Sequence, residues 1–296
     1  TLLANFGIDA QPFIYSAGQA LPSIAIMSVW QGVGYQMIIF LGGLQNINPA
    51  LYEAAEMDHA SGWQKFKDIT LPELPTEHIK KLVDLWVERF NVIKEDEKIK
   101  YVFIFENRGE LVGVTMPHPH GQIYGYSFLP KKLELEVENA KRYLKEKDAC
   151  LFCEMLRQEV AFEQRVIFRN DHFTVFLPFF TEYPYGVYIM SNTHRPTIAD
   201  FTEEERLALA ETLRRTTGML DSLFGYKFPY MMCMYNAPVN GEDPSAYFHW
   251  HIAFYPPMRS ADKVKFNASS ETGAWAHCNP TCPEETAKEL RAAYER

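Results

Sequence analysis

One pattern of residues occurs twice in this chain, and it restricts the possible folds more than any other feature. Each copy contains an amphipathic helix, a strand, an asparagine-containing turn and a second strand that carries two histidines separated by one residue. The histidine pairs begin at His118 and His249, and the asparagines are Asn107 and Asn236. Residues i and i+2 of a strand point to the same face of a sheet. The sequence therefore predicts two related α+β units, built from antiparallel sheets with packed helices.

Hydrophobic periodicity and turn residues place the individual elements of these units. A helix at 77–90 is expected to begin after a capping Thr76 and to bury Leu82 with Ile79, Val83, Trp86 and Phe90. Glu106–Gly109 reads as a turn. The other predicted elements are strands at 100–105, 118–124, 229–235 and 249–251, and helices at 131–147, 202–223 and 283–294.

Charge is distributed unevenly along the 296 residues. No Asp, Glu, Lys or Arg occurs from Ala10 to Tyr52, and Ser23–Leu44 within this run is long enough to cross a bilayer. A buried helix of a water-soluble domain is the alternative interpretation, because Gln31 and Gln36 lower the hydropathy. The net charge of −9 argues against a general nucleic-acid-binding surface. An odd number of cysteines, five, favours a reducing compartment, and we expect a cytoplasmic location.

The segment that follows the uncharged run carries a transporter-like motif. Glu53–Pro72 reads EAAEMDHASGWQKFKDITLP. It resembles the cytoplasmic loop of ABC-type sugar transporter permeases, and the resemblance extends back to Gln31. Such a loop docks on an ATPase subunit, so the resemblance implies a permease fragment over residues 1–72 with membrane contact through residues 23–44. No further predicted span follows, and one span cannot form a translocation path.

A second motif indicates a different function for the rest of the chain. The sequence PHPHGQIYGYSFLP, preceded by FENRG and GVT, resembles the active-site segment of the galactose-1-phosphate uridylyltransferase family, in the histidine-triad superfamily. The resemblance runs from about Leu74 to Arg296. It implies an enzyme of galactose metabolism that moves UMP from UDP-glucose to galactose 1-phosphate in a ping-pong reaction. An imidazole suits this chemistry, since it is a neutral nucleophile at pH 7.

The resemblance also assigns residue roles. His120 corresponds to the nucleophile, His118 to a metal ligand, and Gln122 to the residue that contacts the transferred phosphoryl group. The positions that hold the nucleotide phosphates correspond to Asn107, Gly113 and Thr115.

Cys150 and Cys153 form a CxxC motif, which by itself is either a redox pair or half of a metal site. No strand is predicted directly before it, which disfavours a thioredoxin-like redox unit. The superfamily resemblance adds His194 and His249 as partners. Two cysteines and two histidines leave no open position on a tetrahedral zinc ion, so the resemblance implies a structural zinc site.

Some family members hold iron in the second half through one glutamate and three histidines. Here Glu136 and His251 correspond to two of those ligands, whereas Tyr235 and Ala253 occupy the other two positions. This departure from the family pattern predicts no iron.

A segment near the C-terminus is implied by the resemblance to reach the sugar phosphate of a neighbouring subunit. Lys265 and Phe266 lie in this segment. The resemblance therefore implies a homodimer whose active sites take residues from both subunits.

The predicted domain organisation is a permease-like fragment at 1–72, the last part of a first uridylyltransferase repeat at 73–147, and a complete second repeat at 148–296. The family's first repeat normally supplies another CxxC and uridine-binding residues, and these have no counterpart here. Thr70–Leu74 fits both motifs, so a chimera joined at this pentapeptide is expected, with little turnover. Two alternatives stay open: a transporter fragment, and a histidine-triad nucleotide hydrolase or phosphorylase, whose acceptor is water or phosphate.

Overall fold

The computed structural model describes residues 76–114 and 121–295. The chain divides into two compact units, residues 1–78 and 79–296, and the second unit contains every described strand. The predicted membrane segment at 23–44 and the permease-like segment at 1–72 lie outside the described residues. Among the residues that are described, no helix has the length and apolar character needed to span a membrane.

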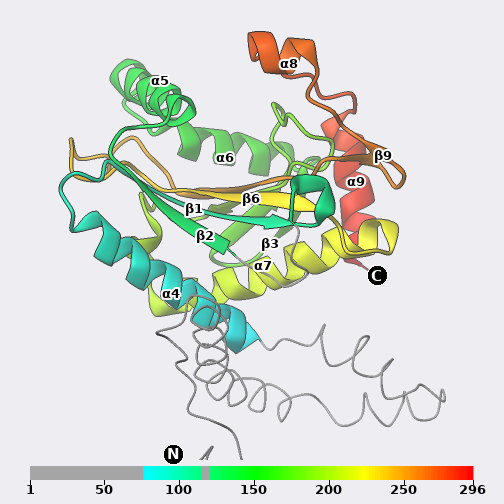
Figure 1. Ribbon diagram of the computed structural model, residues 1–296, viewed down its shortest axis with the longest axis horizontal. Helices are drawn as coiled ribbons and strands as arrows, with labels where there is room; N and C mark the ends of the chain where they lie inside the picture. The colour runs from blue at the N-terminus through cyan, green and yellow to red at the C-terminus, as the bar shows by residue number, and fades with distance from the viewer. Residues whose placement is uncertain (1–75, 115–120, 296) are drawn as a thin grey trace, which may run out of the picture. The chain divides into compact units, whose positions relative to one another are not determined.

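A seven-stranded antiparallel sheet forms the centre of the second unit (Figure 1). Its strand order is β2-β1-β6-β7-β5-β4-β3. In chain order the strands are β1 (Tyr101–Arg108), β2 (Gly121–Tyr126), β3 (Val166–Arg169), β4 (Phe173–Phe176), β5 (Tyr188–Ser191), β6 (Tyr230–Tyr235) and β7 (His251–Tyr255). The hairpin of β1 and β2 lies directly beside the hairpin of β6 and β7, because β1 pairs with β6. The two copies of the sequence pattern therefore share one continuous sheet.

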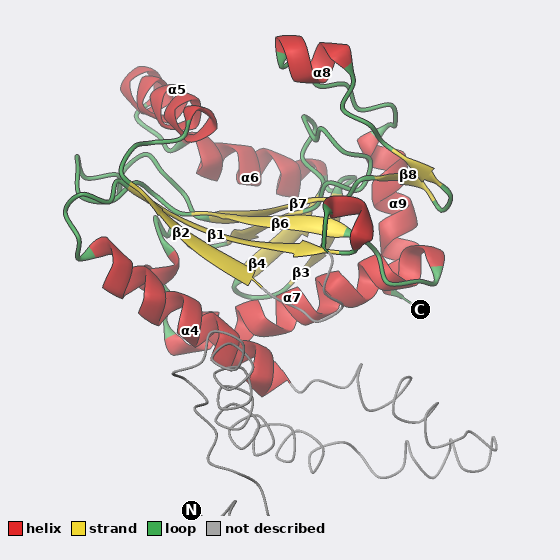
Figure 2. Cartoon of the chain, viewed as in Figure 1, coloured by secondary structure: helices red, strands yellow, loops and turns green. Residues whose placement is uncertain are grey.

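Helices cover both faces of this sheet (Figure 2). One face is covered by α4 (Thr76–Lys94) and α7 (Glu203–Phe224), and α9 (Pro283–Tyr294) packs against α7 and β3. The opposite face is covered by α5 (Lys131–Lys147) and α6 (Leu151–Phe162). Towards the C-terminus, a small sheet of β8 (Met258–Ser260) and β9 (Lys263–Val264) precedes the short helix α8 (Ser269–Ala274).

The alternation of side chains along each strand divides the core into two layers. In β1, Val102 and Ile104 belong to the core under α4 and α7, whereas Tyr101 belongs to the core under α5 and α6. In β7, Ile252 and Phe254 point to the first layer and Ala253 to the second. This α+β architecture of antiparallel sheet and packed helices confirms the predicted fold class for the described unit.

Two details of the predicted strands are wrong. Residues 106–108 were expected to form a turn, but β1 continues to Arg108 because these residues pair with residues 230–232 of β6. His249 was expected to lie on the same strand as His251, but β7 begins at His251. The residue before β7 is hydrogen-bonded to a segment outside the strands, since the Trp250 N–H donates to the Arg195 carbonyl oxygen at 2.7 Å.

The predicted helices agree more closely with the structure. The helix predicted at 202–223 is α7, and Thr202 is its N-cap and forms a capping box with Glu205. In α4, however, Leu82 is 40% exposed, because the buried stripe runs through Val83, Trp86, Val87 and Phe90 and leaves Leu82 on its flank. Thr76 is the first residue of α4 rather than its cap.

Candidate functional site

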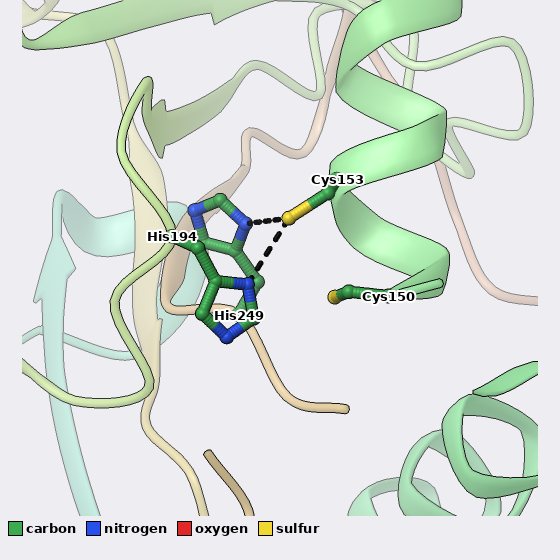
Figure 3. Close-up of side chains that lie close together, drawn as sticks. All are labelled: Cys150, Cys153, His194 and His249. Carbon is green, nitrogen blue, oxygen red and sulfur yellow. Dashed lines mark hydrogen bonds between the residues drawn. The ribbon is translucent and has the colours of Figure 1, made fainter. Parts of the chain in front are cut away.

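Four side chains that can ligate a metal meet at one place in the structure. Cys150 is the N-cap of α6, and Cys153 lies in the first turn of this helix. His194 follows β5 by three residues, and His249 precedes β7 by two. The four ligand atoms all lie within 4.8 Å of one another, and Figure 3 shows Cys153 directed at both imidazole rings. The sequence prediction that these four residues belong to one cluster agrees with this geometry.

The distances in the cluster suit a tetrahedral metal ion. Cys153 Sγ lies 3.0 Å from His194 Nδ1 and 3.3 Å from His249 Nδ1. In tetrahedral zinc sites, metal–ligand bonds of about 2.0–2.3 Å place neighbouring ligand atoms about 3.3–3.8 Å apart. The cluster is therefore close to the required geometry, and small side-chain movements bring all four atoms to bonding distance.

Backbone carbonyls fix which nitrogen of each imidazole faces the cluster. His194 Nε2 lies 2.7 Å from the Ser245 carbonyl oxygen, and His249 Nε2 lies 3.0 Å from the Ser191 carbonyl oxygen. A carbonyl only accepts hydrogen bonds, so both Nε2 atoms carry the proton and donate it. Each Nδ1 then presents its lone pair to the cysteine sulfurs. Outer hydrogen bonds of this kind are typical of histidines that bind metals.

The cluster also favours the protonation states that a metal requires. The pKa of the Cys150 thiol is lowered, chiefly because Cys153 donates a hydrogen bond to its sulfur. Burial lowers the pKa of His249 to about 3, so this imidazole is neutral near pH 7. Both shifts favour the forms that ligate a metal, a thiolate and a neutral imidazole.

The residues predicted to hold the nucleotide occupy the hairpin of β1 and β2. Phe105 pairs with Gln122, and Asn107 lies two residues from Phe105 along β1. Because side chains alternate along a strand, Asn107 and Gln122 share one face of the sheet. Gly113 adopts the left-handed conformation at the end of the turn after β1, with φ of 83°. The predicted site residues Thr115, His118 and His120 lie outside the described residues.

The end of β1 is tied to α7 by a charged pair that the sequence did not reveal. Arg108 Nη2 lies 2.7 Å from Asp221 Oδ2, and the guanidinium group lies 5.4 Å from the centre of the Tyr230 ring. Asp221 Oδ1 also accepts a hydrogen bond from the Phe228 N–H at 2.8 Å. The next residue, Gly109, has φ of 97°, and a Cβ at this position would lie 2.8 Å from Pro229 Cβ. The backbone that leads from Asn107 to Gly113 therefore leaves the sheet in a fixed direction.

The C-terminal candidates differ from each other in exposure. Lys265 is 8% exposed, and its Nζ lies 3.3 Å from Asn267 Oδ1 and 3.8 Å from Glu271. Phe266 is 77% exposed. Of the two side chains, only that of Phe266 is largely exposed.

Glu136 lies on α5, and His251 is the first residue of β7. The family resemblance aligned both with iron ligands and gave neither a role in uridylyl transfer. His251 stacks between two tyrosines, with ring centres 5.5 Å from Tyr188 and 4.7 Å from Tyr235. The Tyr235 hydroxyl is hydrogen-bonded to Tyr255 at 2.7 Å, and Ala253 has no donor atom. These residues do not fit a four-ligand iron site.

Comparison with protein families divides the chain into three matches. Residues 136–291 match the C-terminal domain of galactose-1-phosphate uridyl transferase, and residues 66–130 match its N-terminal domain. Residues 2–76 match a binding-protein-dependent transport system inner membrane component.

Curated relatives and solved structures agree with the first two matches. The galactose-1-phosphate uridylyltransferase of Thermotoga maritima is 44% identical over 221 residues, which cover 75% of this chain and 69% of that protein. The enzyme of Haemophilus influenzae is 33% identical, over 76% of this chain and 64% of its own length. The chain thus spans about two thirds of the length of these relatives. A solved uridylyltransferase structure is 32% identical with a TM-score of 0.71, covering 76% of this chain and 70% of that chain. An ADP-glucose phosphorylase from Arabidopsis thaliana, 22% identical over 75% of this chain and 68% of its own, shares the fold with a TM-score of 0.65.

Proposed function

The chain belongs to the galactose-1-phosphate uridylyltransferase family, and we propose that it carries a uridylyl-transfer site in which His120 is the nucleophile. The curated relatives are named for this nucleotidyltransferase activity. The observation that supports the proposal most is the shared face of Asn107 and Gln122 on the hairpin of β1 and β2. Asn107 and Gln122 are diagonal neighbours on this face, a relation that is typically about 7–8 Å across a strand pair.

The proposed reaction has two steps. A ring nitrogen of His120 attacks the α-phosphorus of UDP-glucose, and the bond to the bridging oxygen breaks, so that glucose 1-phosphate leaves. A phosphate oxygen of galactose 1-phosphate then attacks the uridylyl-histidine, the phosphorus–nitrogen bond breaks, and UDP-galactose leaves. The Gln122 amide donates to a nonbridging oxygen of the transferred group. A donor of this kind contributes a factor of about 10²–10³ to a rate.

Asn107, Gly113 and Thr115 are assigned to the nucleotide phosphates. Gly113 is suited to this role because its left-handed conformation and missing side chain allow a bulky anion to approach the backbone closely at the end of a turn. The tie between Arg108 and Asp221 holds this turn in place.

Zinc is the metal proposed for the cluster of Cys150, Cys153, His194 and His249. Two sulfurs and two imidazole nitrogens are a common donor set for zinc, and four protein ligands leave no position for a substrate. The metal would hold the start of α6 against the segments that follow β5 and precede β7. His118 is proposed as a ligand of a separate metal.

A homodimer is proposed, in which Phe266 projects towards the partner's sugar phosphate. The exposure of this large apolar side chain supports an intermolecular role. Lys265 is proposed to position the segment through its contacts with Asn267 and Glu271.

An isotope-exchange assay tests the proposed function. With UDP-glucose and labelled glucose 1-phosphate, and no galactose 1-phosphate, the chain is expected to form labelled UDP-glucose, because the first step is reversible through the covalent enzyme. His120→Asn is expected to lose this exchange, while the matched variant His172→Asn keeps it. Exchange that persists in His120→Asn contradicts the proposal. Release of UDP or UMP from UDP-glucose, with no label entering UDP-glucose, favours a phosphorylase or a hydrolase instead.

A further inference from the structure

A pocket of about 530 Å³ lies between α5 and α6, and none of the described residues assigned to uridylyl transfer, such as Asn107 and Gln122, belongs to its lining. Its volume is within the range of pockets that bind small molecules, about 300–1,000 Å³. The side chains of α5 and α6 form its walls, and Tyr188 of β5 and His251 of β7 belong to its lining.

Aromatic rings make up much of this lining. Phe152, Phe180 and Tyr188 contribute three of them, and the Phe180 ring meets the Tyr188 ring edge-on at 5.8 Å. Phe179 and Phe180 are 66% and 44% exposed, so these two side chains stand where the pocket opens to solvent. Aromatic faces attract organic cations as well as apolar groups.

Three carboxylates and one arginine line the pocket, and most of them already have partners. Glu154 accepts hydrogen bonds from Arg157 and Gln158. Glu159 accepts from Arg165 at 2.8 Å and from the Phe179 N–H at 3.1 Å. Arg165 also pairs with Glu284.

Glu136 differs from the other acidic residues of the lining. Its Oε2 is buried and has no hydrogen-bond partner. Burial raises the pKa of this carboxyl to about 7, with Lys132 opposing the shift and Glu182 adding to it. Lys132 donates to the Tyr255 hydroxyl at 2.9 Å. A buried acceptor without a partner destabilises a fold unless a ligand satisfies it.

His251 supplies a second acceptor to the same lining. Its Nδ1 lies 3.1 Å from the His249 carbonyl oxygen and donates to it, so Nε2 has the free lone pair. Two acceptor atoms without a hydrogen-bond partner, Glu136 Oε2 and His251 Nε2, therefore belong to residues of one lining, and they select a ligand group that donates hydrogen bonds.

We propose that the pocket between α5 and α6 binds a small organic ammonium ion with an aromatic or alkyl body. The ammonium group donates to Glu136 Oε2 and to His251 Nε2, and the body packs against Phe152, Phe180 and Tyr188. Charge complementarity favours a cation, since Glu154 and Glu159 are paired with arginines whereas Glu136 Oε2 has no hydrogen-bond partner. The residues proposed to contact the amine have no assigned role in uridylyl transfer.

Calorimetric titration of the full chain with benzylamine and with benzyl alcohol, at pH 8, tests the proposal. These probes share one shape and differ in charge. Benzylamine is expected to bind at least tenfold more tightly than benzyl alcohol. Glu136→Gln is expected to remove this preference, whereas Glu138→Gln, which removes an exposed carboxylate from the same helix, is expected to keep it.

Two further measurements show whether the amine occupies this pocket. Met155→Trp fills the pocket and is expected to abolish benzylamine binding, with a thermal unfolding midpoint close to that of the parent. The metal content of the parent and of Glu136→Gln is expected to be equal. Equal affinity for the two probes, amine binding that survives Met155→Trp, or one metal equivalent lost in Glu136→Gln would overturn the proposal.

Discussion

At the scale of single residues, the protonation of a few side chains governs what each cluster can bind. The Nε2 atoms of His194 and His249 are committed to backbone carbonyls, so their Nδ1 atoms face the two cysteines. Glu136 is the opposite case, a carboxyl whose Oε2 the fold leaves without a partner. The first arrangement presents a complete ligand set, and the second presents an unsatisfied acceptor.

Removal of one sulfur from the cluster tests the metal centre. Cys153→Ser is expected to reduce the bound zinc from about one equivalent to less than a tenth, and to lower stability by several kcal/mol, because a structural site contributes its binding energy to folding. Plasma mass spectrometry and calorimetry measure both quantities. Cys282→Ser, which changes an exposed cysteine, is the control. Unchanged zinc in Cys153→Ser rules out the site.

The raised pKa of Glu136 predicts an unusual dependence of stability on pH. Folding raises its pKa from 4.5 to about 7, so the folded state binds more protons between these values and loses stability as the pH rises. Full ionisation costs on the order of 3 kcal/mol. Glu136→Gln is therefore expected to be more stable than the parent at pH 8 and nearly equal to it at pH 4.5. Urea unfolding at both pH values measures the difference, and a gap that does not grow with pH contradicts the assignment.

At the scale of helices and strands, contacts between distant segments determine where β1 ends and where β7 begins, and local sequence patterns do not predict these two boundaries. Glu106, Asn107 and Arg108 have the composition of a turn, yet β6 extends the ladder through all three. His249 has the spacing of a strand residue, yet its imidazole bonds to Ser191 and its segment precedes β7. Local signals predicted α5, α7 and α9 well, because their amphipathic patterns and end residues agree with their packing.

The contact between β1 and α7 provides a test at this scale. Asp221→Ala removes the partner of Arg108 and the acceptor of the Phe228 N–H, and is expected to cost about 1–3 kcal/mol of unfolding free energy. Asp262→Ala removes an exposed carboxylate, whose contact is with Ser260, and is expected to cost less than about 0.5 kcal/mol. Chemical denaturation measures both. Equal effects of the two variants would show that the tie to α7 does not stabilise the end of β1.

The candidate site was predictable only in part, for physical reasons. The CxxC motif fixes two ligands one helical turn apart, and the family resemblance added His194 and His249. By contrast, the pocket at Glu136 depends on how α5 packs beside α6 over β5 and β7. Local sequence patterns do not predict this packing. Ser191 and Ser245 orient the histidines through backbone carbonyls, which every residue type possesses, and the Ser191 hydroxyl also lies 2.9 Å from His249 Nε2.

At the scale of the whole molecule, the sequence matches of two protein families overlap. The match to the transport component at 2–76 and the match to the uridyl transferase N-terminal domain at 66–130 overlap, and Thr70–Leu74 lies within this overlap. A join at this pentapeptide stays a prediction, which uninterrupted long sequencing reads across its codons can check. The uridyl transferase matches extend over the unit that the structure describes, so the proposed chemistry belongs to that unit.

The covalent step is the central claim, and peptide mass spectrometry tests it most directly. After exposure of the chain to UDP-glucose, the peptide that contains His118-Pro119-His120 is expected to carry one UMP, attached to residue 120, and to lose it when galactose 1-phosphate is added. His120→Asn is expected to carry none. A chain that acquires no UMP at residue 120, or acquires it equally in His120→Asn, contradicts the proposed covalent mechanism.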